Sequence, residues 1–329
     1  MIELLEKLTQ ITAPSGNENH IHDFIINEIK EYVDEIDIDA LGNLIAHKKG
    51  NGKKLMFASH TDEIGIVITY IEDNGMLRFT TLGGVSAHYA LYQRVKFTGG
   101  TYGVVSFENK DEETLKNLKT SDLYIDIGAK SKKEAEKTVS LGEAACFMGE
   151  FLVCGENVIS KALDDRAGCT ALINAIKSFK EHKNDLYFVF TASEELGLRG
   201  AKVAANRINP DFAIAIDVTR TGDVPGKLKM AVSLGDGAAI KIKDSSFIAH
   251  PIVKNKMIEV CEKNNVKYQL EVLEAGGTDS GAIQLSGSGV PSGCISIPTR
   301  YIHSPSEMIN LNDLKCVSDL ATKIIEAGF

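Results

Sequence analysis

Short, uninterrupted apolar runs recur along the chain, and each is followed by polar residues. The clearest runs cover residues 55–58, 186–190, 212–216 and 295–297. They are rich in Val, Ile and Phe and short, which is typical of strands buried on both faces of a parallel sheet. The pattern predicts an α/β fold with a mixed, largely parallel sheet flanked by helices.

Helical periodicity appears on both sides of these runs. A first helix is expected from near Asn17, and a last one from about Asn312 to Ala327. A third should follow Asp164. The apolar faces of the first and third are predicted to hold Ile21, Phe24, Ile25 and Ile29, and Cys169, Leu172, Ile173 and Ile176 respectively.

The middle of the chain follows a different pattern, of short strands and turns. Strands at residues 66–71 and 76–81 flank Asp73-Asn74-Gly75, a strong hairpin signal. Further elements are expected at residues 94–97, 102–107 and 123–127, with a short helix near 131–137. We therefore predict a small β-barrel-like domain at residues 65–155, inserted into a catalytic domain made of residues 1–64 and 156–329.

Candidate ligands stand where the predicted strands end. His60, Glu194-Glu195, Asp217 and His303 each come at or just after one of the four apolar runs. Open α/β sheets collect ligands at the carboxyl ends of their strands, so these side chains should converge. Asp164 precedes the predicted helix and joins them as a candidate bridge.

Two imidazoles and three carboxylates suit zinc, cobalt or manganese. If one carboxylate bridges, the five residues give three ligands to each of two ions, and zinc is the ion expected first. Asp62 could accept a hydrogen bond from the free imidazole nitrogen of His60. In Ser193-Glu194-Glu195, one carboxylate can ligate while the other handles the proton of a water molecule.

The motifs of the chain resemble those of the tetrahedral-type metallo-aminopeptidases, which include glutamyl and deblocking aminopeptidases. The resemblance runs from near the first residue to near the last. The matching segments, in family order, are residues 13–18, 59–65, 162–168, 191–197, 216–219, 276–280 and 297–304.

This resemblance implies a two-metal enzyme that releases N-terminal residues from short peptides. One ion would take His60, Asp217 and bridging Asp164, and the other would take Glu195, His303 and Asp164. Glu194 would be the base, and Thr278 would lie beside the substrate. The inserted domain would build a homodimer and then a dodecamer. Residues 83–89 around His88 depart from the family's usual aromatic and proline-containing loop.

Simpler interpretations exist for single residues. Asp165 fits a helix N-cap better than a ligand. Glu194-Glu195 could favour a helix dipole. The other histidines read as exposed or helix-face residues, namely His20, His22, His47, His182 and His250.

Two other functions remain open from the sequence. Similar chains are sometimes described as endoglucanases, but a glycosidase needs two facing carboxylates and no metal. A non-catalytic metal-binding assembly module is the second alternative, and in it Glu194 would be dispensable.

Composition and charge narrow the partners. The 329-residue chain is 43% hydrophobic and 25% charged, with a net charge of −9, which argues against nucleic acid. No membrane-spanning run or secretory signal is seen. The six cysteines include no C-x-x-C pair, so a reduced, cytoplasmic protein is expected.

A side-chain preference is the last prediction from the sequence. Arg220 closely follows Asp217, and Lys241 and Lys243 alternate with isoleucines on a short strand. A cation facing the pocket would favour Glu or Asp substrates. The alternative is that all three are solvated surface cations.

Overall fold

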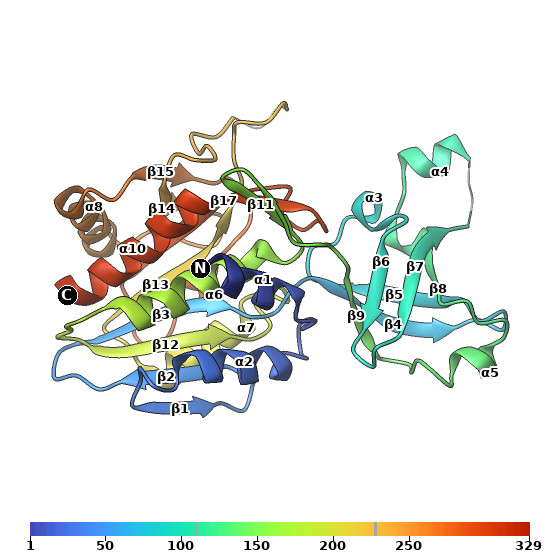
Figure 1. Cartoon of the computed structure of the whole chain (residues 1–329), viewed down its shortest axis with the longest axis horizontal. Coiled ribbons are helices and arrows are strands. Elements are labelled where there is room, and N and C mark those ends of the chain that lie inside the picture. The colour runs from blue at the N-terminus through green and yellow to red at the C-terminus, as the bar shows by residue number, and fades with distance from the viewer. Residues whose placement is uncertain (109–110, 227–228) are drawn as a thin grey trace.

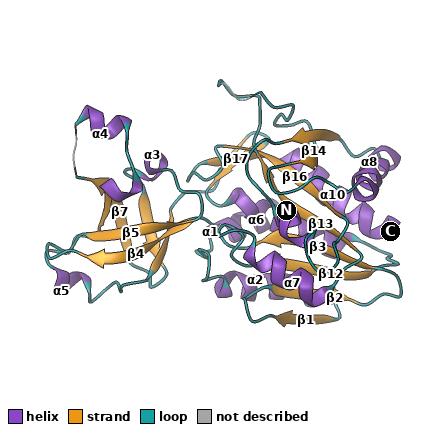
Figure 2. Ribbon diagram, turned by 180° about the vertical axis from the view of Figure 1, so that it is seen from behind, coloured by secondary structure: helices purple, strands orange, loops and turns teal. Residues whose placement is uncertain are grey.

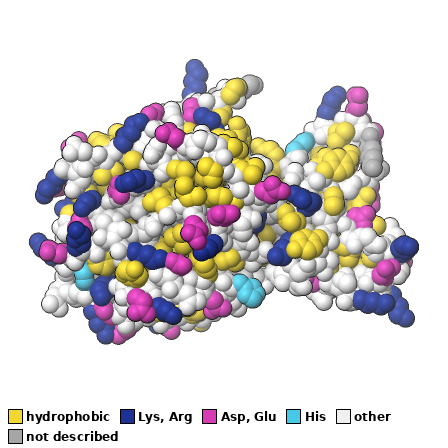
Figure 3. Space-filling model, in the orientation of Figure 1, with side chains coloured by type: hydrophobic (Ala, Val, Ile, Leu, Met, Phe, Trp, Pro, Cys, Tyr) yellow, Lys and Arg dark blue, Asp and Glu magenta, His cyan; other side chains and the backbone are white. Residues whose placement is uncertain are grey.

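The computed structural model describes residues 1–108, 111–226 and 229–329. Within them, a large α/β body carries a separate barrel on one side (Figure 1). In the space-filling view the barrel stands out as a smaller lobe (Figure 3). On that face, Lys and Arg side chains are interspersed with Asp and Glu rather than gathered in a stripe.

Eleven strands of the described residues form the large sheet. Four neighbouring strands at its centre, β12, β3, β13 and β16, run parallel, and the strands around them are mostly antiparallel. The strands are β1 (Glu35–Ile38), β2 (Leu44–Lys48), β3 (Lys54–His60), β10 (Leu152–Cys154), β11 (Asn157–Ser160), β12 (Asp185–Thr191), β13 (Phe212–Thr219), β14 (Ala238–Lys243), β15 (Tyr268–Val272), β16 (Ser292–Arg300) and β17 (Glu307–Asn310).

Helices cover both faces of this sheet (Figures 1 and 2). They are α1 (Ile2–Gln10), α2 (Asn19–Ile29), α6 (Leu163–Ser178), α7 (Arg199–Ile208), α8 (Pro251–Asn264), α9 (Asp279–Ile283) and α10 (Leu311–Ala327). Side chains of β3 alternate between the two layers. Leu55 and Phe57 join the core under α6 and α10, whereas Met56 and Ala58 join the core under α7. The predicted α/β class is confirmed.

The barrel is closed by six strands in the order β4-β5-β8-β7-β6-β9. These are β4 (Gly65–Ile71), β5 (Leu77–Leu82), β6 (Arg94–Phe97), β7 (Tyr102–Phe107), β8 (Leu123–Asp126) and β9 (Ala144–Phe147), with short helices α3 (Ala87–Ala90), α4 (Glu112–Lys116) and α5 (Lys132–Ala135) and a 3₁₀ turn at Thr120–Asp122. Its own core includes Ile66, Phe97 and Ile125.

Three details differ from the sequence-based expectation. Helix α1 precedes the helix expected first, and buries Leu5 and Leu8. Residues 152–154, assigned to the inserted domain, form edge strand β10 of the large sheet, because they pair with β11. His22 lies on the buried face of α2, where its Nε2 is 3.2 Å from Thr61 Oγ1.

Candidate metal centre

The parallel strands deliver the candidate ligands to one edge of the sheet. His60 is the last residue of β3, Asp217 lies near the end of β13, and the Glu194-Glu195 loop follows β12. His303 follows β16. Asp164 reaches the same place from the first turn of α6, where its backbone is not helical.

Asp164 lies between the two imidazoles. Its Oδ1 is 3.0 Å from His60 Nε2, and its Oδ2 is 3.3 Å from His303 Nε2. Asp217 Oδ1 is 3.9 Å from His60 Nε2, and Glu195 Oε1 is 3.1 Å from His303 Nε2. The five residues therefore form two groups of three that share one carboxylate, which is the arrangement expected for a bridge.

Both imidazoles are oriented through their other nitrogen. The Nδ1 of His60 is 3.1 Å from the Asp62 carbonyl oxygen, and the Nδ1 of His303 is 3.1 Å from that of Gly84. A carbonyl can only accept, so each Nδ1 carries a hydrogen and donates it. Each Nε2 then faces carboxylate oxygens, and this set of nitrogen and oxygen donors fits a divalent metal ion.

The charges of the site require neutralisation. Although burial lowers the pKa of the His303 imidazole, its hydrogen bonds to Asp164 and Glu195 raise it to about 12. Burial and the neighbouring Asp164 charge hold the pKa of Asp217 well above its usual range. An uncompensated carboxylate cluster of this kind is costly unless protons or metal ions neutralise it.

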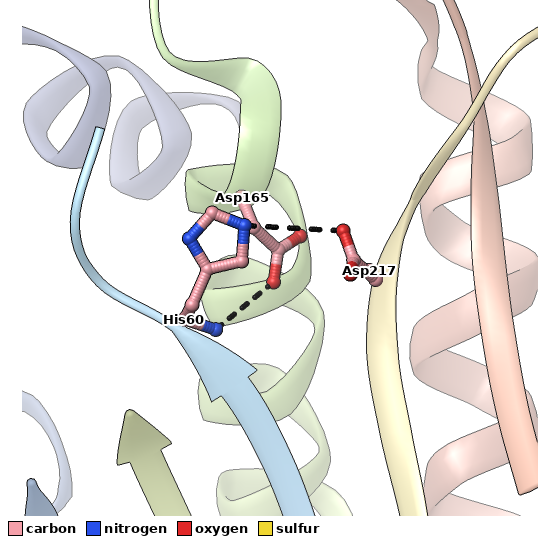
Figure 4. A group of neighbouring side chains, drawn as sticks. All are labelled: His60, Asp165 and Asp217. Atoms are coloured by element: carbon pink, nitrogen blue, oxygen red, sulfur yellow. Dashed lines mark hydrogen bonds and ion pairs between the residues drawn. The ribbon is translucent and has the colours of Figure 1, made fainter. Parts of the chain in front are cut away.

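Asp165 has a different set of partners from its neighbour Asp164. Its Oδ2 accepts from the Ser59 hydroxyl at 2.5 Å and from the His60 peptide nitrogen at 3.3 Å, and its Oδ1 accepts from the Gly168 nitrogen at 3.0 Å. Figure 4 shows Asp165 beside His60 and Asp217, close enough for a metal-binding group. Both its oxygens are already engaged, so it fits the role of a helix-start residue.

The loop that carries Glu194 and Glu195 is held by its peptide nitrogens. Asp62 accepts from the nitrogens of Glu194 and Glu195, at 3.0 and 3.2 Å, and Glu18 accepts from that of Ser193 at 3.0 Å. The Ser15 hydroxyl donates to Asp62 at 2.5 Å. The sequence predicted that the Asp62 carboxylate would partner His60, and Asp62 Oδ1 does lie 3.5 Å from His60 Nδ1, beside the closer Asp62 carbonyl oxygen at 3.1 Å.

A third carboxylate, Glu307, fixes two ligand-bearing segments at once. One of its oxygens accepts from the Asp164 nitrogen at 2.9 Å and the other from the His303 nitrogen at 2.8 Å. Burial raises the pKa of Glu307 to about 8. Neither Glu18 nor Glu307 was assigned a role from the sequence, although Glu18 lies within a motif that carried the resemblance.

A cavity of about 360 Å³ opens on this centre. Its lining includes His60, Asp164, Glu194, Glu195, Asp217 and His303, together with Arg220 and the Gly276-Gly277 turn. Burial, followed by the charges of Asp217 and Asp279, raises the pKa of Glu194 well above the usual range of a glutamate.

Two of the three predicted substrate residues lie elsewhere. Lys241 is buried and paired with Glu271 on the neighbouring strand, so it is not a solvated cation and does not line the cavity. Thr278 is buried, with its Oγ1 3.5 Å from Asp244 Oδ2, and it does not line the cavity. Arg220 is exposed and lines the cavity.

Comparison with known proteins matches residues 42–320 to the model of the M42 glutamyl aminopeptidase family. A putative aminopeptidase of Acetivibrio thermocellus is 54% identical over 99% of this chain and 98% of its own. The lysyl aminopeptidase of Pyrococcus furiosus is 33% identical over 98% of this chain and 96% of its own.

Solved structures agree in fold along the whole chain. An aminopeptidase from the archaeon Desulfurococcus kamchatkensis has a TM-score of 0.96, with 42% identity over 99% of this chain and 94% of its own. The TET1 peptidase of Pyrococcus horikoshii, which assembles into a tetrahedron or a large octahedral shell, has a TM-score of 0.88, with 36% identity over 98% of each chain. A protein described as an endoglucanase from Thermotoga maritima has a TM-score of 0.84, with 32% identity over 98% of this chain and 97% of its own.

Proposed function

The chain belongs to the M42 glutamyl aminopeptidase family and is a peptide hydrolase of the aminopeptidase class, and we propose that it works with two divalent ions that share Asp164. One ion would be held by His60, Asp217 and Asp164, and the other by Glu195, His303 and Asp164. The observation that carries this proposal is the position of the Asp164 carboxylate, with one oxygen toward each imidazole. Zinc suits this ligand set, and cobalt or manganese are alternatives.

The ions would supply Lewis acidity, polarising the scissile carbonyl and making a water molecule more acidic. Glu194, half-buried at the wall of the cavity and outside both ligand groups, would take the proton of the attacking water and pass it to the departing amine. Asp62 and Glu18 would keep that carboxylate in place by holding the peptide nitrogens of its loop.

The metal requirement can be tested by preparing the protein with and without chelator. Metal-free protein should be inactive on an aminoacyl chromogenic substrate, and zinc, cobalt or manganese should restore its activity. Elemental analysis should return two ions per chain. Full activity in protein shown to contain no metal would rule the proposal out.

A glycosidase is less well supported by the same residues. It would use two facing carboxylates, whereas here the carboxylates gather around two imidazoles that a glycosidase does not need. Cleavage of a β-glucan in the presence of chelator would revive that alternative. Retention of aminopeptidase activity in Glu194→Gln would exclude Glu194 as the base. A non-catalytic assembly module would show no such activity in the unmodified chain.

We also propose a preference for acidic N-terminal residues, because Arg220 lines the cavity. The known relatives do not decide this point, since one of them is a lysyl aminopeptidase. Comparison of kcat/KM for glutamyl, leucyl and lysyl substrates decides it, and a lysyl preference would refute the idea.

Assembly into homodimers through the barrel, and into a closed dodecamer, is a further part of the proposal. It rests on the similarity to the assembling TET1 peptidase of P. horikoshii. Light scattering of the metal-loaded protein should give a mass far above that of one chain.

Among the described residues, no helix combines the length and apolar composition that a membrane crossing requires. A cytoplasmic location is proposed from the six unpaired cysteines.

A further inference from the structure

The barrel contacts the metal centre at the Gly83-Gly84 turn, which follows β5. The Gly84 carbonyl oxygen accepts the hydrogen of His303 Nδ1 at 3.1 Å, and Gly84 lines the cavity beside that imidazole. The residue that sets the tautomer of His303 therefore belongs to the inserted domain, 219 positions away in the chain.

Close approach at this turn requires the absence of side chains. A Cβ on Gly84 would lie 2.7 Å from His303 Nδ1, and one on Gly83 would lie 2.8 Å from Glu195 Oε2. Real Cβ atoms essentially never approach so closely, and Gly83 also has a φ of +78°. The two glycines thus pack directly against both unshared ligands of one proposed metal position.

The other metal position is built differently. The Nδ1 of His60 donates to the carbonyl of Asp62, which lies two residues away in the same domain. The His60 side chain is 2% exposed, whereas that of His303 is 30% exposed. Within the described residues, the hydrogen bonds and ion pairs of the His60 side chain therefore all come from the catalytic domain.

We infer that the barrel completes the metal position of His303 and Glu195, so that the affinity of this position depends on the seating of Gly83-Gly84, whereas that of the His60 and Asp217 position does not. The inference rests on the proposed two-metal function. Partners that orient a ligating imidazole typically change metal affinity 10- to 100-fold, because they fix its tautomer and raise its basicity. The same range is expected here, confined to one of the two ions.

Titration of zinc into metal-free protein tests this by calorimetry. The unmodified chain should bind two ions. Gly84→Ala should bind one of them with unchanged affinity and the other about 10- to 100-fold more weakly. Gly100→Ala is the control, because Gly100 also lies in a barrel turn, and its φ of +96° strains an alanine there, but nothing lies within 4 Å of its Cβ position. It should bind both ions as the unmodified chain does.

The outcomes separate the two proposals. Fewer than two sites in the unmodified chain would overturn the two-metal function itself. Two sites there, together with unchanged or equally weakened binding of both ions in Gly84→Ala, would overturn the role of the barrel and leave the function standing.

Because a clash at Gly84 could also unfold the barrel, a second measurement uses the unmodified chain. Amide hydrogen exchange of peptides covering residues 83–90 should slow when the second equivalent of zinc is added, and not with the first. Exchange that is unaffected by the second equivalent would overturn the inference.

Discussion

The Glu194 peptide nitrogen donates a hydrogen bond to Asp62 Oδ1 at 3.0 Å. The loop that carries the proposed base is therefore held by a carboxylate from the segment that follows β3. The other oxygen of Asp62 accepts from the Glu195 nitrogen and the Ser15 hydroxyl. Asp62 is fully buried. The Asp62 carboxylate thus positions both the proposed base, Glu194, and the proposed ligand, Glu195. It does so through their peptide nitrogens rather than their side chains.

Replacing Asp62 by Asn should weaken this support. An amide offers one acceptor oxygen and turns an NH₂ group toward donors, so at least one peptide nitrogen loses its partner. We expect kcat to fall about 10- to 100-fold, with a smaller change in KM. Asp73→Asn, in an exposed hairpin turn of the barrel, is the control. Equal kinetics for the two variants would show that the Asp62 contact is dispensable.

Glu194→Gln keeps the size of the side chain and removes its ability to take a proton. Loss of a positioned base typically costs about 10²- to 10⁴-fold in rate, and that is the fall expected in kcat. The metal content should stay at that of the unmodified chain, because Glu194 lies outside both ligand groups. Glu136→Gln, on the exposed surface of the barrel, should leave the rate unchanged.

Asp164 and Asp165 should respond in opposite ways to substitution. Asp164→Ala should lose both ions in elemental analysis, because its carboxylate faces both imidazoles. Asp165→Asn should keep the ions and lower the free energy of unfolding by about 1–3 kcal/mol, because it leaves the Ser59 and Gly168 donors poorly partnered. Unchanged metal content in Asp164→Ala would exclude the bridge, and loss of metal in Asp165→Asn would make Asp165 a ligand.

The order of apolar runs was enough to predict the sheet, because residues buried on both faces of parallel strands leave a clear signal. It also predicted which residues reach the sheet edge, since strand ends are marked by the first polar side chains. The supports of the site left no such signal. Glu18 and Glu307 act on peptide nitrogens 175 and 143 positions away, and no local pattern encodes such a contact.

Lys241 is a second case in which a partner distant in the sequence could not be predicted from the local pattern. Alternation predicts that Lys241 and Lys243 share one face, but the pairing of β14 with β15 shifts register between them, and alternation does not reveal which residues pack against either. In the fold, β15 pairs with β14 and sets Glu271 opposite Lys241. The charge is therefore neutralised inside the protein, while Lys243 stays exposed.

Acid should weaken the fold through Asp223, which accepts hydrogen bonds from Arg300 at 2.6 and 3.2 Å. Although burial opposes it, the Arg300 guanidinium lowers the pKa of Asp223 to about 2, below the ordinary 3.8. A depressed carboxyl pKa stabilises the fold above the unfolded-state pKa, and this stabilisation is lost as the pH falls from about 4 to about 2. Partial exposure limits it to about 1 kcal/mol.

Urea unfolding of Asp223→Asn and the unmodified chain measures this contribution. The variant should be less stable at pH 6, and the difference should shrink toward zero as the pH approaches 2. A difference that stays constant over this range would show that the ion pair with Arg300 does not stabilise the fold.

Arg220→Ala should selectively reduce turnover of acidic substrates. The guanidinium lines the cavity and is exposed, so a glutamyl side chain could pair with it, whereas a leucyl side chain gains nothing from it. We expect kcat/KM to fall about 10-fold for the glutamyl substrate and to change little for the leucyl one, a difference of about 1.4 kcal/mol in transition-state binding. Lys243→Ala removes an exposed cation that does not line the cavity, and it should leave both values unchanged.

Lys241→Ala tests whether the buried lysine contributes to stability rather than to substrate specificity. Its ammonium is buried against Glu271, so removing it leaves an unpaired buried carboxylate and should cost about 3–5 kcal/mol of stability. Any loss of activity should then affect glutamyl and leucyl substrates alike. If Lys241→Ala instead abolished the glutamyl preference alone, the buried lysine rather than Arg220 would set the specificity, and the cavity would have to extend to β14.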